Sequence, residues 1–226
     1  MIRRESLALH LVTDDRVGFE ALPSIVDAAV AGGVTLVQLR DKTCEAAELV
    51  RRARVLSDAI AGRVPLLIDD RVDVALAARD AGAQVDGVHL GQNDIPPITA
   101  RRLLGPTAVI GWTANTEDHL RAAHAMPEGT LDYLGVGVIR PTATKADHPP
   151  ALGIAGFAAR AASTPLACVA IGGVGADDVV PLRRAGAAGV AVVSAICGAA
   201  DPAAAARAFT AAAARHSRGA SDGAAR

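Results

Sequence analysis

Charged and polar residues follow the second of a series of short apolar segments. Gln38, Arg40 and Lys42 alternate there with Leu39 and Asp41. Alternate residues of an extended segment point to the same side, so Gln38, Arg40 and Lys42 can face one ligand. Two cations and an amide suit an anionic substrate such as a phosphate ester. The alternative interpretation is a charged loop exposed to solvent.

Carboxylates follow the next two apolar segments. Asp69 and Asp70 come directly after the third, and Asp94 comes shortly after the fourth. If the two segments are neighbouring strands, Asp70 and Asp94 lie at the same end of a sheet. Two carboxylates there suit Mg²⁺, because this ion usually binds one or two carboxylates, waters and substrate phosphates. Capping of a helix by Asp94, just before Pro96, is the competing interpretation. His89 has no second histidine at ligand spacing, which favours a core or supporting role for it.

Hydroxyls and glycines follow the later apolar segments. Thr113 ends the fifth segment with a hydroxyl. After the sixth, seventh and eighth segments, the residues that indicate a second anion site are Thr142, Thr144, Lys145, Gly173 and Ser194. Glycine after a seventh strand, with a small residue after an eighth, is the usual phosphate-binding arrangement of parallel barrels, because bare backbone N–H groups and a helix N-terminus point at the anion. The long connection over residues 139–152 has the length of a lid that closes over a site.

The elements that must hold these residues alternate regularly. Apolar segments, which predict strands, cover residues 8–13, 35–39, 65–69, 87–90, 108–113, 133–138, 166–171 and 189–193, and segments of helical composition separate them. Such repetition predicts a parallel sheet with right-handed crossovers. Eight units of roughly 25 residues fit a single-domain (β/α)₈ TIM barrel better than an open sheet. We assign residues 1–214 to the barrel and predict a disordered tail over residues 215–226, which are rich in Ser, Gly, Ala and Arg.

Composition restricts the partners. The 226-residue chain has a net charge of −1 and only 2% aromatic residues, which argues against nucleic-acid binding. No apolar run reaches the ~18 residues of a membrane span, and the first residues lack the apolar part of a secretion signal. Three cysteines without a Cys-x-x-Cys pair indicate reduced thiols, so we expect a cytoplasmic protein that acts on small phosphorylated molecules. The sequence leaves open whether the chain forms a homo-oligomer.

Six of these segments, in chain order, resemble the thiamine-phosphate synthase family. The likeness extends from about residue 10 to residue 209, and the matching segments are residues 37–42 (VQLRDK), 68–71 (IDDR), 87–94 (GVHLGQND), 142–145 (TATK), 170–174 (AIGGV) and 193–196 (VSAI). Each segment alone is a modest match. Together, each at its own strand end, they make a specific signature.

The resemblance implies a Mg²⁺-dependent barrel enzyme that joins hydroxymethylpyrimidine diphosphate to a thiazole phosphate and releases pyrophosphate. It implies that the pyrimidine diphosphate is held by Gln38, Leu39, Arg40, Asp41, Lys42, Asp69, Thr113 and Lys145. The same likeness assigns Mg²⁺ to Asp70 and Asp94, and the thiazole phosphate to Thr142, Ala143, Thr144, Gly173, Val193 and Ser194. Arg40, Lys42 and Lys145 would neutralise the charge of the leaving diphosphate.

The chain departs from the family pattern at three places. The family usually has asparagine at the position of Asp69 and serine at that of Thr113, and it usually has Pro-Val-Phe where this chain has Val138, Ile139 and Arg140. Asp69 therefore adds a carboxylate beside the expected diphosphate, Thr113 keeps the hydroxyl, and Arg140 is a candidate for a further phosphate contact.

Two other functions remain open on the sequence. A thiazole tautomerase-like isomerase would share the fold and the phosphate site without needing the cationic and metal-binding half, whose presence here favours the synthase. A non-catalytic barrel that binds a phosphate ester would be expected to lack several of these groups, and Asp69 is the one residue that supports it.

Overall fold

The computed structural model describes the backbone of residues 2–142 and 150–224, with side chains up to residue 215. Its strands are β1 (Leu9–Val12), β2 (Leu36–Leu39), β3 (Leu66–Asp69), β4 (Gly87–Leu90), β5 (Val109–Thr113), β6 (Tyr133–Gly137), β7 (Ala167–Ile171) and β8 (Gly189–Val192). Each lies within one residue, at either end, of an apolar segment that predicts a strand. All pairings are parallel and β8 pairs with β1, so the sheet is closed. The predicted (β/α)₈ barrel is confirmed.

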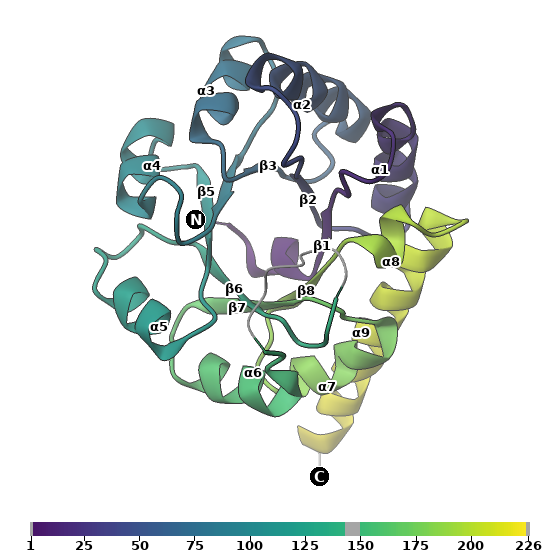
Figure 1. Ribbon diagram of the computed structural model, residues 1–226. Helices are drawn as coiled ribbons and strands as arrows, with labels where there is room; N and C mark the ends of the chain where they lie inside the picture. The colour runs from purple at the N-terminus through teal and green to yellow at the C-terminus, as the bar shows by residue number, and fades with distance from the viewer. Residues whose placement is uncertain (1, 143–149, 225–226) are drawn as a thin grey trace.

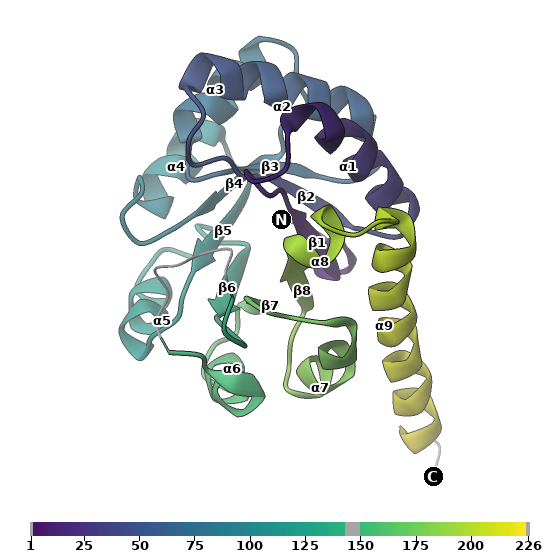
Figure 2. The same cartoon turned by 45° about the vertical axis from the view of Figure 1, so that its right-hand side comes forward.

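Helices form the outer layer of the barrel (Figures 1 and 2). They are α1 (Leu22–Ala31), α2 (Ala46–Ile60), α3 (Val72–Asp80), α4 (Pro97–Leu104), α5 (Glu117–His124), α6 (Gly153–Ala162), α7 (Val179–Arg184), α8 (Ser194–Cys197) and α9 (Pro202–Ala224), with short 3₁₀ turns at Arg4–Leu7, Phe19–Ala21 and Ala176–Asp178. The last helix, α9, packs against α1 and α7, so the end of the chain closes the ring.

The pleat of each strand separates two apolar layers. Val37, Leu39, Val88 and Leu90 belong to the large core between sheet and helices, whereas the inside of the barrel holds a smaller cluster that includes Tyr133. Because side chains alternate along a strand, the residues between the outer-layer positions must point inward. The inward positions of β2 to β5 include Gln38, Asp69, His89 and Thr113. The alternation therefore directs these polar side chains into the barrel.

The C-terminal helix differs from the sequence-based expectation. The structure continues α9 to Ala224, through most of the segment over residues 215–226 for which the composition predicts a disordered tail. Alanine has the highest helix propensity of the amino acids, and the helix that precedes the segment is Ala-rich. None of the helices in residues 2–142 and 150–224 combines the length and the apolar character that crossing a bilayer requires.

Candidate active site

A cavity of about 230 Å³ opens at the carboxyl ends of the strands, and all eight strands or the loops that follow them contribute to its lining. This is the end at which barrel enzymes carry out chemistry. The predicted site residues that line the cavity are Gln38, Arg40, Lys42, Asp69, Asp70, Thr113, Thr142, Gly173, Val193 and Ser194. The structure thus brings together most of the residues that the sequence places at separate strand ends.

Other predicted site residues lie elsewhere. The Leu39 side chain is buried in the layer between sheet and helices, because it occupies the outward position next to Gln38. The Asp41 carboxylate accepts hydrogen bonds from the backbone N–H groups of Thr43 and Cys44 and pairs with an arginine of α2. Neither side chain lines the cavity, and the substrate contacts of these two residues stay a prediction. Residues 143–145, which include Lys145, lie outside the described part of the chain.

Asp69 is at the centre of a charged cluster. Gln38 donates a hydrogen bond of 2.5 Å from Nε2 to Asp69 Oδ1, and Lys42 Nζ lies 3.2 Å from Asp69 Oδ2. Arg40 Nε lies 3.8 Å from the same oxygen, and Lys42 Nζ also contacts the carboxylate of Asp70. The cations expected to face a diphosphate therefore face carboxylates in the structure.

Asp15, on the loop after β1, also belongs to the cluster, and the sequence interpretation missed it. Its Oδ2 lies 3.1 Å from Arg40 Nη1 and accepts a hydrogen bond from the backbone N–H of Lys42. Arg40 thus lies between the carboxylates of Asp15 and Asp69, with only 16% of its side chain exposed. The available signal was that Asp15 follows the first apolar segment, as the other candidates follow theirs.

The donor set after β3 and β4 fits a hard cation. Asp70 lines the cavity, and its contact with the Lys42 ammonium shows that the carboxylate can hold a positive charge. Asp94 does not itself line the cavity, but its carboxylate accepts a 2.6 Å hydrogen bond from the backbone N–H of Gly91, which does. Among the described residues no group of three or more potential His, Cys, Asp or Glu ligands occurs. Two carboxylates suffice for Mg²⁺, which keeps several waters.

The competing interpretation of Asp94 as a helix cap is not supported. Helix α4 begins at Pro97 with Pro96 at its cap position, and no side chain accepts a hydrogen bond from its first turn. Instead the Asp94 carboxylate closes the turn that begins at Gly91. That turn holds Asp94 near the end of β4.

Glycines after β7 shape the other half of the cavity. Gly173 has φ +65°, and a Cβ there would lie 2.8 Å from Arg140 Cβ and 2.9 Å from the Arg140 carbonyl oxygen. The backbone N–H of Arg140 donates to the carbonyl of Gly172 at 2.9 Å, so the loops after β6 and β7 are joined. The short helix α8 begins at Ser194 directly after β8. This is the arrangement by which many barrels bind a phosphate group.

Arg140 pairs with Asp178 near the glycine-rich half of the cavity. Its guanidinium donates two hydrogen bonds to Asp178, and Asp178 also accepts one from the backbone N–H of Gly175. The hydrogen bonds from Arg140 hold the pKa of Asp178 below its ordinary value. Arg140 does not line the cavity in the structure, and it fastens the loop after β6 to the turn after β7.

Substitution of Gly173 by alanine should damage this half of the site specifically. The strained φ and the contacts with Arg140 should raise the Michaelis constant for the substrate that binds against Gly173 at least tenfold and cost ~1–3 kcal/mol of stability. The matched control is Gly82→Ala, since Gly82 has φ +87° but no atom within 4 Å of the added Cβ. Steady-state kinetics and thermal unfolding of both variants test this. Equal Michaelis constants in the two variants would contradict it.

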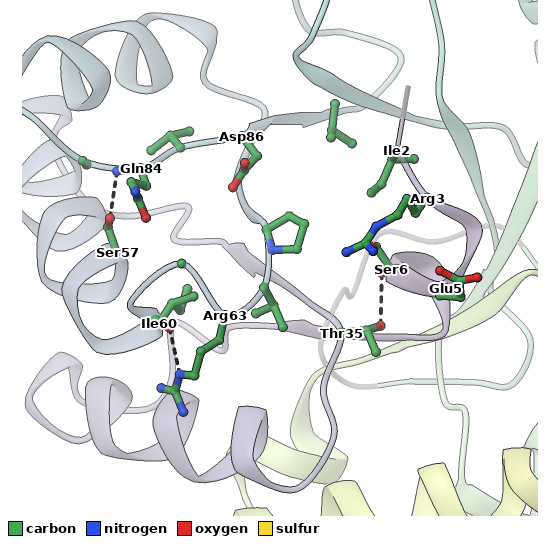
Figure 3. Close-up of a pocket in the computed structure, with 16 residues that line it drawn as sticks. Ile2, Arg3, Glu5, Ser6, Thr35, Ser57, Ile60, Arg63, Gln84 and Asp86 are labelled. Carbon is green, nitrogen blue, oxygen red and sulfur yellow. Dashed lines mark hydrogen bonds between the residues drawn. The ribbon is translucent and has the colours of Figure 1, made fainter.

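A larger concavity, of about 820 Å³, lies at the opposite end of the barrel (Figure 3). Its polar groups are used within the fold: Asp86 accepts from the backbone N–H of Leu66, and Ser57 accepts from that of Gln84. The amino ends of barrel strands serve stability rather than chemistry. The smaller cavity, with its convergent charged groups, is therefore the candidate active site.

Comparison with known proteins identifies the family of the chain. The profile of a family described as thiamine monophosphate synthase matches residues 9–196. The chain belongs to the thiamine monophosphate synthase family. Thiamine-phosphate synthase from Xanthobacter autotrophicus is 49% identical over 208 residues, which cover 91% of this chain and 95% of that protein. Thiamine-phosphate synthase from Azorhizobium caulinodans is 47% identical over 203 residues, 89% of this chain and 92% of that one.

A solved structure supports the same membership of the thiamine monophosphate synthase family. Thiamine phosphate pyrophosphorylase from Pyrococcus furiosus superposes with a TM-score of 0.80 at 29% identity, covering 94% of this chain and 98% of that one. The resemblance noted on six sequence segments is thus confirmed. So is the prediction that the chain is a transferase enzyme, because its relatives at high coverage are thiamine-phosphate synthases.

Proposed function

We propose that this protein joins 4-amino-2-methyl-5-hydroxymethylpyrimidine diphosphate to a thiazole phosphate, giving thiamine phosphate and pyrophosphate. The observation that carries the proposal is one cavity whose lining combines two sets of groups suited to anions. Arg40 and Lys42 line one half, and Gly173 and Ser194 line the other. A synthase needs both halves, whereas an isomerase acting on a thiazole phosphate would need only the second.

The reaction follows from the chemistry of the pyrimidine. The bond between the methylene carbon and the diphosphate oxygen breaks, and the diphosphate leaves with the electron pair. The aminopyrimidine ring delocalises the positive charge on the methylene, and the thiazole nitrogen then attacks that carbon. The step needs neutralisation of the leaving group's charge in a preorganised site, not a protein nucleophile.

The residues divide the work accordingly. Gln38, Asp69 and Thr113 line the part of the cavity that would bind the pyrimidine diphosphate, with Arg40 and Lys42 as the cations for its oxygens. Lys145 stays a predicted third cation. For the thiazole phosphate we propose Thr142, Gly173, Val193 and Ser194, which line the cavity on its other side. Ala143 and Thr144, which lie outside the described part of the chain, stay predicted contacts.

Asp70 and Asp94 would hold Mg²⁺. Bound there, the ion would supply a positive charge that stabilises the leaving diphosphate. Lys42 would move from Asp70 to the diphosphate, and its side chain, 47% exposed, has room to do so. We also propose a cytoplasmic location, in keeping with Cys44, Cys168 and Cys197, which are all unpaired.

The direct test is release of pyrophosphate by the purified protein. Release should require the pyrimidine diphosphate, the thiazole phosphate and Mg²⁺ together. Turnover with both substrates but no metal would remove the assignment of Mg²⁺. A protein that isomerises a thiazole phosphate and releases no pyrophosphate would be the isomerase instead.

Replacement of Asp69 by asparagine should keep turnover and lower the Michaelis constant for the pyrimidine diphosphate by about threefold to tenfold. An amide can still accept a hydrogen bond, while it no longer repels the diphosphate or neutralises Arg40 and Lys42. The measurement is steady-state kinetics with each substrate varied. If Asp69→Asn abolishes turnover and weakens Mg²⁺ binding, Asp69 is a metal ligand.

A further inference from the structure

A chain of polar side chains runs from the closed interior of the barrel to the cavity. The hydroxyl of Tyr133, on β6, lies 2.9 Å from Nδ1 of His89, on β4. Nε2 of the same imidazole lies 3.1 Å from Oγ1 of Thr113, on β5. Tyr133 is 1% exposed, whereas His89 and Thr113 line the cavity. The imidazole therefore connects a buried phenol to a hydroxyl at the site.

Two glycines make room for this chain. A Cβ at Gly111 would lie 2.2 Å from Tyr133 Cζ and 2.5 Å from His89 Nδ1. A Cβ at Gly135 would lie 2.9 Å from His89 Cε1. Any other residue on β5 or β6 at these inward positions would displace the rings. The space for the imidazole is thus built into the two strands beside it.

The surroundings of Tyr133 and His89 determine which atoms of this hydrogen-bonded series carry the protons. Burial raises the pKa of Tyr133, so its hydroxyl keeps the proton at neutral pH. Within residues 2–142 and 150–215, the hydroxyl has only His89 Nδ1 as a hydrogen-bond partner. A buried donor left without an acceptor is costly, so the phenol donates to Nδ1. Nδ1 then carries no proton, and Nε2–H donates to Thr113 Oγ1.

The neighbouring His10 does not compete for the phenol proton. Its ring meets the Tyr133 ring edge to face, with centroids 5.2 Å apart, and its Nε2 has no hydrogen-bond partner in the described structure. Burial, and to a smaller extent His89, lowers the pKa of His10 to about 3, so it adds no charge to the chain at neutral pH. The arrangement of Tyr133, His89 and Thr113 is left undisturbed.

We propose that His89, held by Tyr133, is a positioning residue that makes the Thr113 hydroxyl a hydrogen-bond donor into the cavity. With its oxygen accepting from Nε2–H, the hydroxyl directs its own hydrogen to an acceptor atom of the bound pyrimidine diphosphate. The identity of this ligand rests on the proposed function. The hydrogen-bonded series Tyr133, His89 and Thr113 would favour a substrate with an acceptor atom near the Thr113 hydroxyl and disfavour one with a donor there.

Nitrogen-15 NMR of the full-length protein, free of substrate, tests the orientation of the chain. The imidazole signals of His89, assigned by their loss in His89→Gln, should show the proton on Nε2. In Tyr133→Phe, which keeps the ring but removes the donor, the signals should shift toward a mixture of tautomers. A proton on Nδ1 in the wild-type protein, or an unchanged tautomer in Tyr133→Phe, would overturn the proposal.

Kinetics test the consequence for the substrate. Tyr133→Phe and Thr113→Val should each raise the Michaelis constant for the pyrimidine diphosphate about tenfold and leave that for the thiazole phosphate unchanged. The double variant should be no worse than Thr113→Val alone, because both changes remove the same donor. Additive effects, or equal effects on both substrates, would indicate a merely structural role. His89→Gln should keep most of the activity, since an amide can accept from Tyr133 and donate to Thr113.

A matched control is His124→Gln, which removes an imidazole that lies 2.9 Å from the hydroxyl of Thr164 on the exposed surface. It should change neither Michaelis constant. If the wild-type protein released no pyrophosphate, the proposed function would fail, yet the NMR experiment would still decide how His89 is oriented.

Discussion

Replacing Asp70 with asparagine should lower the kcat of the Mg²⁺-dependent reaction about a thousandfold or more and leave the fold intact. Loss of a metal ligand removes several kcal/mol of stabilisation from a leaving diphosphate, and each ~1.4 kcal/mol is a factor of ten in rate. Asparagine is the informative substitution because Asp70 has φ +59°, a conformation that Asn tolerates better than most residues. Alanine would add backbone strain to the loss of the carboxylate.

The measurement is pyrophosphate release over a Mg²⁺ titration, with thermal unfolding to confirm the fold. Asp73→Asn is the control, because Asp73 lies three residues away and pairs with Arg71 on the surface. It should retain wild-type kinetics. Asp94→Asn, like Asp70→Asn, should need a higher Mg²⁺ concentration than the wild-type protein to reach half of its maximal rate of pyrophosphate release. Near-normal turnover of Asp70→Asn at ordinary Mg²⁺ would end the assignment of the metal to this residue.

Replacing Lys42 with methionine should have two effects of opposite sign. The kcat should fall about a hundredfold, because a cation aimed at the leaving group is lost. The affinity of the free protein for Mg²⁺ should rise, because the Lys42 ammonium, which contacts Asp70 and lies 3.2 Å from Asp69, no longer competes for these carboxylates. Methionine keeps the length and much of the volume of the side chain.

Calorimetric titration with Mg²⁺ alone measures the second effect without turnover. Arg63→Met is a control for the change in net charge, because Arg63 pairs with Asp27 and lines the concavity at the other end of the barrel. It should affect neither quantity. Weaker Mg²⁺ binding in Lys42→Met would mean that the lysine does not compete with the metal, and an unchanged kcat would remove Lys42 from the reaction.

Much of the site follows from local pattern. The period of two along each strand places Gln38, Asp69 and Thr113 inward, and the parallel order brings the ends of their strands to one rim. The same pattern places the Leu39 side chain between two inward positions, where it packs against the helices, and a substrate contact of this residue stays a prediction. A resemblance between whole segments does not distinguish residues that contact the substrate through the side chain from residues that contact it through the backbone.

Pairings between distant residues could not be predicted in the same way. The sequence interpretation assigned the cations to a substrate, yet Arg40 lies against Asp15 and Asp69, and Lys42 against Asp70. The position of a charged residue in the sequence does not determine which oppositely charged side chain it contacts. Which carboxylate it meets depends on how loops after different strands approach each other.

By itself the sequence determined the barrel, the family and the strand ends that carry the chemistry, because hydrophobic alternation and turn residues act over a few neighbouring positions. Only the tertiary structure decided that His89 joins Tyr133 to Thr113, residues 44 and 24 positions away from it in the chain. The contact between Tyr133 on β6 and His89 on β4 passes across β5, so it requires the curvature of the closed sheet and the space left by Gly111 and Gly135. Closure is a property of all eight strands together, so no single segment of the sequence contains it.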